Sequence, residues 1–167
     1  MSEEWMSRGY ITLEELDGVH PLPGRERLME GPVAIPECPQ EIPCTPCREI
    51  CPTGAITMER VNDPPRVDYS KCIGCSLCVQ ICPGLAFFMV HLKEGKARVT
   101  MPYEYLPLPR RGERVRLLDR KGEVVGEGVV VMVMTRERSR GDTAVLTVEM
   151  AEELAMVVRA VEVMGDE

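Results

Sequence analysis

Eight cysteines are the residues of this 167-residue chain whose type and spacing could do chemistry. Ionised cysteine is a ligand for soft metals, including zinc and the iron of iron–sulfur clusters, and it also forms disulfides. The eight are Cys38, Cys44, Cys47, Cys51, Cys72, Cys75, Cys78 and Cys82. Their crowding into one stretch of the sequence predicts a single metal-binding or redox module rather than unrelated thiols.

The cysteine stretch contains an internal repeat. Segments 44–56 and 75–87 superimpose without gaps at an offset of 31 residues, and each has an isoleucine before its last cysteine and a proline after it. The second copy is complete as Cys72-x2-Cys75-x2-Cys78-x3-Cys82-Pro83. This run is typical of [4Fe–4S] ligation in bacterial proteins, where the fourth cysteine serves the other of two clusters.

This spacing has a physical reason. Three thiolates separated by two residues each can wrap a loop around three corners of an iron–sulfur cube, with backbone N–H groups turned toward the sulfurs. The three-residue step then carries the chain away on a helical turn, and the proline ends that turn. The fourth thiolate therefore points to a different cube, and metal ligation does part of the work of a hydrophobic core.

The first copy departs from this pattern. The position equivalent to Cys72 is Glu41, and the nearest thiol is Cys38, three residues upstream. Residues 39–43 are interpreted as a widened loop that returns Cys38 to the cube, since eight cysteines then serve eight corners. The alternative is that Cys38 is not a ligand, and that the site holds three thiolates with Glu41 as a candidate fourth ligand.

The double run and the segment VDYSKCIGC at residues 67–75 resemble the two-[4Fe–4S] bacterial ferredoxin family over about residues 37–92. The resemblance implies a fold of two β-hairpins and two short helices, with residues 56–59 and 66–69 flanking one connection. By the family's rule, cluster I takes Cys38, Cys44, Cys47 and Cys82, and cluster II takes Cys72, Cys75, Cys78 and Cys51. It also implies that four isoleucines shield the cubes from water, namely Ile42, Ile50, Ile73 and Ile81.

Two other uses of the thiols remain open. Cys44-x2-Cys47 with Cys72-x2-Cys75 would suit a zinc ribbon, but that arrangement leaves four cysteines and both Cys-Pro steps unexplained. The first ten residues have neither a basic segment nor an apolar one, so they do not form a secretory signal and a cytoplasmic location is expected. Disulfides are disfavoured because such a compartment is reducing.

The elements that position the thiols are expected in three parts of an α+β chain. Residues 1–36 form an N-terminal extension and docking segment, in which Thr12 and Glu15 fit the capping box of a short helix. Residues 37–100 form the ferredoxin-like dicluster module. Residues 101–167 form a small, mostly-β barrel or sandwich that starts with a proline-rich linker at 101–111 and continues as strands near 115–118, 124–125, 129–134 and 143–149. A helical turn is expected at 151–156 and a last strand at 157–163.

Composition and the remaining motifs narrow the function. A net charge of −7 argues against a nucleic-acid binder, and no apolar run is long enough to span a membrane. Neither His20 nor His91 has a partner at a spacing that indicates catalysis, so packing or solvated roles are expected. Arg110–Arg111 and Arg136–Arg140 are expected to be solvated turns, with contacts to an acidic partner as the alternative.

The sequence therefore predicts an electron-transfer protein rather than an enzyme. No flavin, nicotinamide or catalytic motif is visible, and all eight cysteines are used by the two clusters. Long flanks without chemistry of their own favour a subunit of an intracellular oxidoreductase complex, whose partner is a flavin-containing dehydrogenase. The alternatives are a free-standing soluble ferredoxin with a β appendage, and a module in which metal only stabilises the fold.

Overall fold

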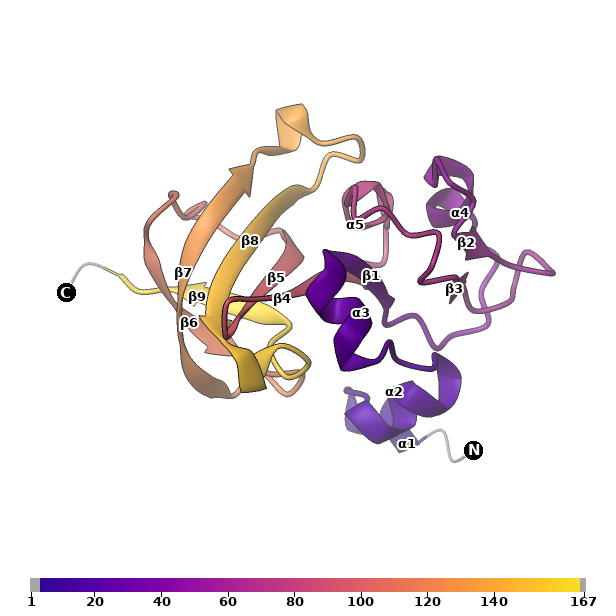
Figure 1. Cartoon of the computed structure of the whole chain (residues 1–167), viewed down its shortest axis with the longest axis horizontal. Helices are drawn as coiled ribbons and strands as arrows, with labels where there is room; N and C mark the ends of the chain where they lie inside the picture. The colour runs from indigo at the N-terminus through magenta and orange to yellow at the C-terminus, as the bar shows by residue number, and fades with distance from the viewer. Residues whose placement is uncertain (1–3, 166–167) are drawn as a thin grey trace.

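The computed structural model describes residues 4–165, and it mixes helices with a large antiparallel sheet, as the expected α+β class requires (Figure 1). The helices among these residues are α1 (Glu4–Arg8), α2 (Leu13–Val19), α3 (Arg25–Glu30), α4 (Pro46–Ile50) and α5 (Leu77–Ile81). The strands are β1 (Val33–Pro36), β2 (Ile56–Thr57), β3 (Arg66–Val67), β4 (Phe87–Lys93), β5 (Lys96–Tyr103), β6 (Arg114–Leu118), β7 (Val124–Met134), β8 (Ala144–Ala151) and β9 (Ala160–Val163). Two 3₁₀ turns, η1 (Arg136–Arg138) and η2 (Glu152–Leu154), flank β8.

Seven strands form one antiparallel sheet in the order β1-β4-β5-β8-β7-β6-β9, while β2 and β3 pair with each other. The strands of 101–167 thus differ from the separate β domain expected there. β5 continues past residue 100 to Tyr103, and Met101 and Tyr103 are both buried. It pairs with β8 along its whole length. β1, from the expected N-terminal extension, forms one edge of the same sheet. The sheet crosses both expected boundaries, and the three-part division of the chain stays a prediction.

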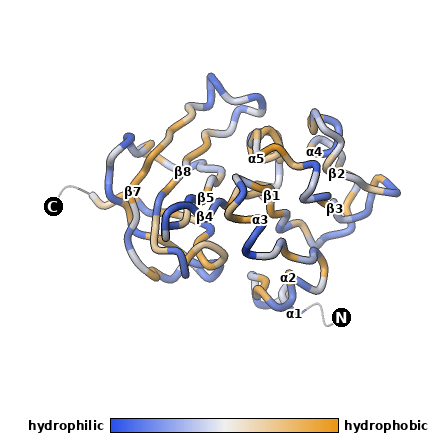
Figure 2. The backbone as a smooth tube through the Cα atoms, viewed as in Figure 1, coloured by the Kyte–Doolittle hydropathy of each residue, from blue (hydrophilic) through white to orange (hydrophobic). Residues whose placement is uncertain are grey.

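Strand β4 is buried on both faces and joins two apolar clusters. Phe88 and Val90 belong to the core enclosed by the curved sheet, whereas Phe87 and Met89 belong to a second cluster with three cysteines. This alternation is the period of two that a strand imposes on its side chains. The cysteine lobe, defined here as residues 37–86, therefore packs on the outer face of the sheet around β4 (Figure 1). Figure 2 shows hydrophobic residues along β7 and β8, with a hydrophilic turn between them.

Several local predictions are confirmed. The Thr12 hydroxyl accepts from the Glu15 N–H while the Glu15 carboxylate accepts from the Thr12 N–H, so the capping box opens α2. Strands occur at 114–118 and 144–151, and the short pieces expected at 124–125 and 129–134 are one strand, β7. The turn expected at 151–156 is 3₁₀ over 152–154, and the last strand begins only at Ala160.

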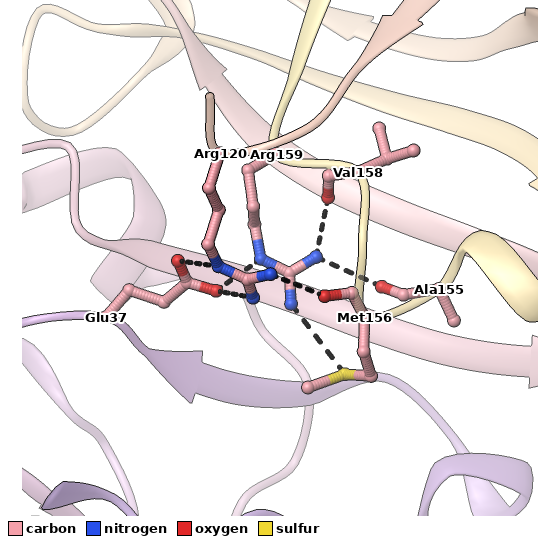
Figure 3. A network of polar contacts seen from close by, with 6 residues as sticks. All are labelled: Glu37, Arg120, Ala155, Met156, Val158 and Arg159. Carbon is pink, nitrogen blue, oxygen red and sulfur yellow. Dashed lines mark hydrogen bonds and ion pairs between the residues drawn. The ribbon is translucent and has the colours of Figure 1, made fainter. Parts of the chain in front are cut away.

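A buried ionic network links the cysteine lobe to the far end of the sheet (Figure 3). Glu37 follows β1, and its carboxylate accepts from Arg120 at 2.6 and 3.0 Å and also from Arg159. Arg120 and Arg159 donate further to the carbonyl oxygens of Met156 and Ala155 at 2.8 and 3.0 Å. Burial by itself would raise the pKa of Glu37, but the two guanidiniums outweigh it and lower that pKa. These contacts bring the region just after edge strand β1 next to the residues that precede edge strand β9.

Candidate metal centres

The eight thiols gather around two cavities. Four of them line one cavity, namely Cys51, Cys72, Cys75 and Cys78. The other four line a second cavity, namely Cys38, Cys44, Cys47 and Cys82. Each cavity takes three thiols from one cysteine run and the fourth from the other run, so the two runs depend on each other for their shape.

Two matching helices produce this exchange. α4 and α5 are five residues long, and each carries the third cysteine of its run, Cys47 or Cys78. The fourth cysteine is the C-cap residue of each helix and has extended backbone, with φ −68° and ψ 112° at Cys51 and φ −67° and ψ 112° at Cys82. The following proline prevents continuation of either helix. One helical turn therefore separates the third and fourth thiols, which is how each run reaches both cavities.

Backbone N–H groups surround the sulfur atoms. The N–H of Ala34 lies 3.4 Å from Sγ of Cys72, and the N–H of Ala86 lies 3.3 Å from Sγ of Cys82. Burial would raise the pKa of Cys51, but hydrogen bonds from nearby backbone N–H groups, with Ile56 first, lower it overall. Such donors stabilise negative charge on sulfur, as thiolate ligands of a metal centre require.

Other thiols resist ionisation without a cation. Burial first, and then the neighbouring Cys82 and Cys44, raise the pKa of Cys38 to about 11. Burial and Cys82 likewise raise the pKa of Cys47 to about 12, and burial with Cys72 and Cys75 raises that of Cys78. Grouped thiols in this environment lose their protons readily only when a bound metal compensates the thiolate charge.

The donor sets suit iron–sulfur clusters. The four thiols of each set line one cavity, and all four are of the soft type that iron–sulfur clusters take. The residues present therefore fit one [4Fe–4S] cube in each cavity.

The widened loop brings Cys38 to the second cavity, together with Gln40 and Ile42. Glu41, the alternative ligand considered from the sequence, is exposed and lies outside that lining. The geometry therefore permits the predicted ligand set of cluster I, in which Cys38 joins Cys44, Cys47 and Cys82.

The apolar shielding differs from the expectation. Ile42 and Ile73 each line a cavity but are 44% and 65% exposed, while Ile50 and Ile81 are half-buried and line neither. The buried apolar wall comes instead from β4, where Phe87 and Met89 contact one cavity each. The continuous apolar run of residues 87–90, which is typical of a strand buried on both faces, was the sequence signal that could have found them.

The two histidines are placed differently. His20 is 3% exposed and lies against the carbonyl oxygen of Cys38, and burial lowers its pKa. His91 is only partly buried on β4. The packing role expected for His20 thus includes a contact with a cysteine loop that the sequence did not reveal.

A family comparison finds a match within the cysteine stretch. Residues 42–101 match the family model described as a 4Fe-4S dicluster domain. Over these residues the chain is similar to that family, and seven of the eight cysteines lie within them. The predicted resemblance to ferredoxins is therefore confirmed for this part of the chain, which runs from the widened loop into β5.

Curated relatives match the chain over short segments. The chain is 46% identical over 37 residues to the uncharacterized ferredoxin-like protein YdhY of Escherichia coli, which is 22% of this chain and 18% of that protein. It is 48% identical over 44 residues to a sulfite dehydrogenase subunit of Allochromatium vinosum, or 26% and 17% of the two chains. It is 50% identical over 38 residues to the thiosulfate reductase electron transfer subunit PhsB of Salmonella typhi, or 23% and 19%.

The chain thus spans less than a fifth of the length of these relatives. No solved structure matches it significantly. Among residues 4–165, no helix is both long and apolar enough to cross a membrane. The chain is thus similar over short segments to a ferredoxin-like protein and to proteins named as subunits of a sulfite dehydrogenase, a thiosulfate reductase and a selenate reductase.

Proposed function

We propose that this chain is an electron-transfer subunit with two [4Fe–4S] clusters in an intracellular oxidoreductase complex, where it exchanges single electrons with a flavin-containing dehydrogenase subunit. The observation that carries the proposal is the pair of four-thiol cavities, of which seven thiols lie in the segment that matches a 4Fe-4S dicluster domain. The relatives support the subunit part, since two of them are named as subunits of a sulfite dehydrogenase and a thiosulfate reductase. The proposal keeps the cytoplasmic location predicted from the N-terminal residues.

The proposed ligand sets follow the two cavities. Cluster I is held by Cys38, Cys44, Cys47 and Cys82, and cluster II by Cys72, Cys75, Cys78 and Cys51. A cube bound in each cavity supplies one-electron transfer, which suits a link between a two-electron flavin and a one-electron acceptor. The thiolates hold the iron, the N–H groups of Ala34 and Ala86 stabilise sulfur charge, and the side chains of β4 exclude water from one side.

Four thiols for each cube leave no iron open to substrate. The proposed role is therefore electron transfer without catalysis by this chain itself. In a complex, the reaction belongs to the partner subunit, and this chain conducts electrons to or from it.

Metal analysis of anaerobically purified protein tests the cofactor. We expect about eight irons and about eight inorganic sulfides per chain. We also expect absorbance near 400 nm that bleaches with dithionite, together with an EPR signal from the reduced protein. Stoichiometric zinc, or a brown protein that dithionite does not reduce, would contradict the proposal.

Paired cysteine variants test the crossed ligand sets. If the assignment is correct, Cys82→Ala and Cys44→Ala damage the same cluster, although the two residues belong to different runs. Cys51→Ala and Cys75→Ala should damage the other cluster. EPR and iron content of the four variants distinguish this from the uncrossed arrangement, in which Cys82→Ala would instead match Cys75→Ala.

Native size distinguishes a subunit from a free ferredoxin. The chain alone is 18.7 kDa. Size exclusion of the protein from its own cells should place it in a larger assembly that also contains flavin. Elution at the monomer size under gentle conditions would favour the free-standing ferredoxin with a β appendage.

A further inference from the structure

The N-terminal residues contact the first cysteine of both runs through side chains. Nε2 of His20 lies 3.0 Å from the carbonyl oxygen of Cys38, to which it donates. Nη2 of Arg27 donates to the carbonyl oxygen of Cys72 at 2.8 Å. Cys38 and Cys72 are the equivalent positions of the two runs, so one segment reaches both cavities at matching points.

The same segment fits closely along the loop of the second run. The hydroxyl of Tyr69 donates to the carbonyl oxygen of Pro21 at 2.7 Å. Gly74 has φ +71°, and a Cβ at this position would come within 2.6 Å of the carbonyl oxygen of Pro32. A side chain there would push the two segments apart, which shows that the contact is between main chains.

Arg27 donates hydrogen bonds to three backbone carbonyl oxygens. Besides Cys72, it donates through Nε to the carbonyl oxygen of Tyr69 at 2.7 Å and through Nη1 to that of Gly31 at 3.1 Å. Its side chain is 18% exposed, and the nearest carboxylate, that of the exposed Glu30, lies 3.9 Å away. A planar guanidinium can satisfy three carbonyls at once, whereas a lysine ammonium cannot match this fork.

We propose that residues 20–34 are a strap that positions both cluster loops, with His20 and Arg27 as its positioning residues and with Arg27 also raising the reduction potential of cluster II. The inference rests on the proposed two-cluster function. It assigns to the N-terminal segment a role inside this chain, in addition to any docking role.

The two contacts have different consequences because the peptides that they hold differ. In a trans peptide the C=O and N–H point in opposite directions. Arg27 holds the carbonyl of Cys72, so the N–H of the next residue, Ile73, points away from Arg27, and Cys72 and Ile73 both line the cavity of cluster II. His20 holds the carbonyl of Cys38, but the next residue is Pro39, which has no N–H.

Arg27 therefore contributes a positive charge and an oriented donor to cluster II, and both favour its reduced, more negative state. His20 contributes only the position of the Cys38 loop. The strap should thus raise the reduction potential of cluster II through Arg27, and it should hold Cys38 in place at cluster I through His20.

The experiment compares Arg27→Gln and Arg27→Lys with His20→Ala and His20→Gln in the full-length protein loaded with iron and sulfide. The measurements are iron content, EPR-monitored redox titration of both clusters, and the rate of iron loss to a chelator. Arg27→Gln should lower the potential of one cluster and leave the other unchanged. Arg27→Lys keeps the charge but loses the fork, so it should keep that potential nearer to the wild-type value and lose iron faster.

His20→Ala should leave both potentials in place and weaken iron retention at the other cluster by about tenfold or more. His20→Gln, whose amide can donate to the same carbonyl, should restore retention. If Arg27→Gln takes up no iron, the contrast between Arg27→Lys and His20→Ala still tests whether each residue acts on a different cluster.

The inference is overturned if Arg27→Gln, with full iron, titrates like the wild type, or if the variants at both positions alter the same cluster. It is also overturned if His20→Ala retains iron as well as the wild type does. A wild-type protein without two reducible clusters would refute the proposed function instead. The two failures are therefore distinguishable.

Discussion

The cysteine lobe and the seven-stranded sheet obtain their order from different sources. In the lobe, α4 and α5 have five residues each, and β2 pairs with β3 at only two positions. In the sheet, β7 has eleven residues and β8 has eight, with ladders on both sides of most strands. The lobe has too little regular structure to stabilise itself through hydrogen-bond ladders.

The interiors differ in the same way. The core enclosed by the sheet is hydrocarbon, with fully buried residues such as Val99, Met101 and Leu146. The cluster that lies between the lobe and the sheet includes the thiols of Cys47 and Cys78. Buried apolar area can account for the sheet, whereas in the proposed holoprotein ligand bonds would cross-link the two runs of the lobe. On that proposal, one chain folds one part around an apolar core and another part around metal.

Removal of iron should have the largest effect, and it should act on the lobe alone. Anaerobic treatment with a strong chelator should expose amides of residues 44–86 to hydrogen exchange, because the cross-links that hold α4 and α5 are lost. Amides of β5 and β8 should stay protected. Hydrogen exchange followed by mass spectrometry of peptides from the two regions makes the measurement.

The matched control is the iron-loaded protein at the same pH and ionic strength. Equal loss of protection in β8 and in α5 would show that the two regions fold as one unit. Metal and hydrocarbon would then stabilise the same structure rather than two different ones.

The lobe was also the part that the sequence predicted best. Ligand spacing reports local geometry, so Cys78-x3-Cys82 implied a helical turn, and the structure has α5 there. The capping box at Thr12 was readable for the same reason, since both partners lie within four residues. Features fixed by neighbours in the sequence need no knowledge of the rest of the fold.

Long-range pairing was not readable. The strands after residue 110 were expected, but nothing in their pattern says that β8 pairs with β5 across the boundary expected after residue 100. Likewise, Glu37 meets Arg159 across 122 residues, and neither residue stands out in the sequence. The contacts of His20 and Arg27 with the cysteine loops were missed because carbonyl oxygens leave no sequence signal.

Truncation of the sheet core should have the next largest effect and should leave the metal centres intact. Leu146 is fully buried on β8, so Leu146→Ala should lower the free energy of unfolding of the sheet by about 4 kcal/mol. Iron content should not change. Val124→Ala, at a position that is 58% exposed, is the control and should cost less than about 1 kcal/mol. Denaturant unfolding followed by circular dichroism, together with iron analysis, measures both variants. Loss of iron from Leu146→Ala at low denaturant would contradict the independence of the metal centres from the sheet core.

The ionic network of Glu37, Arg120 and Arg159 joins the two regions, and its disruption should affect both. Glu37→Gln keeps the shape but leaves two buried guanidiniums without a counter-charge, at a cost of about 3 kcal/mol. Because Glu37 precedes Cys38, iron loss to a chelator should also accelerate. Glu49→Gln, on the surface of α4, is the control and should change neither property. If Glu37→Gln lowers the free energy of unfolding but leaves the rate of iron loss unchanged, the network stabilises the sheet and does not support the cysteine lobe.

The smallest effect is expected at the second contact between the regions, where the turn before β8 meets α5. Gly141 lies so close to α5 that a Cβ would sit 2.1 Å from the carbonyl oxygen of Gln80 and 2.8 Å from Cα of Ile81. Gly141→Ala must therefore shift the turn away from backbone atoms, which we expect to cost about 2 kcal/mol. Gly165→Ala meets no atom within 4 Å and is the control.

The informative readout for Gly141→Ala is where protection is lost. If the turn and α5 support each other, amides of α5 should exchange faster in the iron-loaded variant, while those of β5 remain unchanged. The effect is smaller than that of Glu37→Gln because the turn can shift away from α5, whereas a buried charge cannot find another partner. Unchanged exchange in α5 would mean that ligation alone holds this helix, and it would separate the two regions more sharply than their packing indicates.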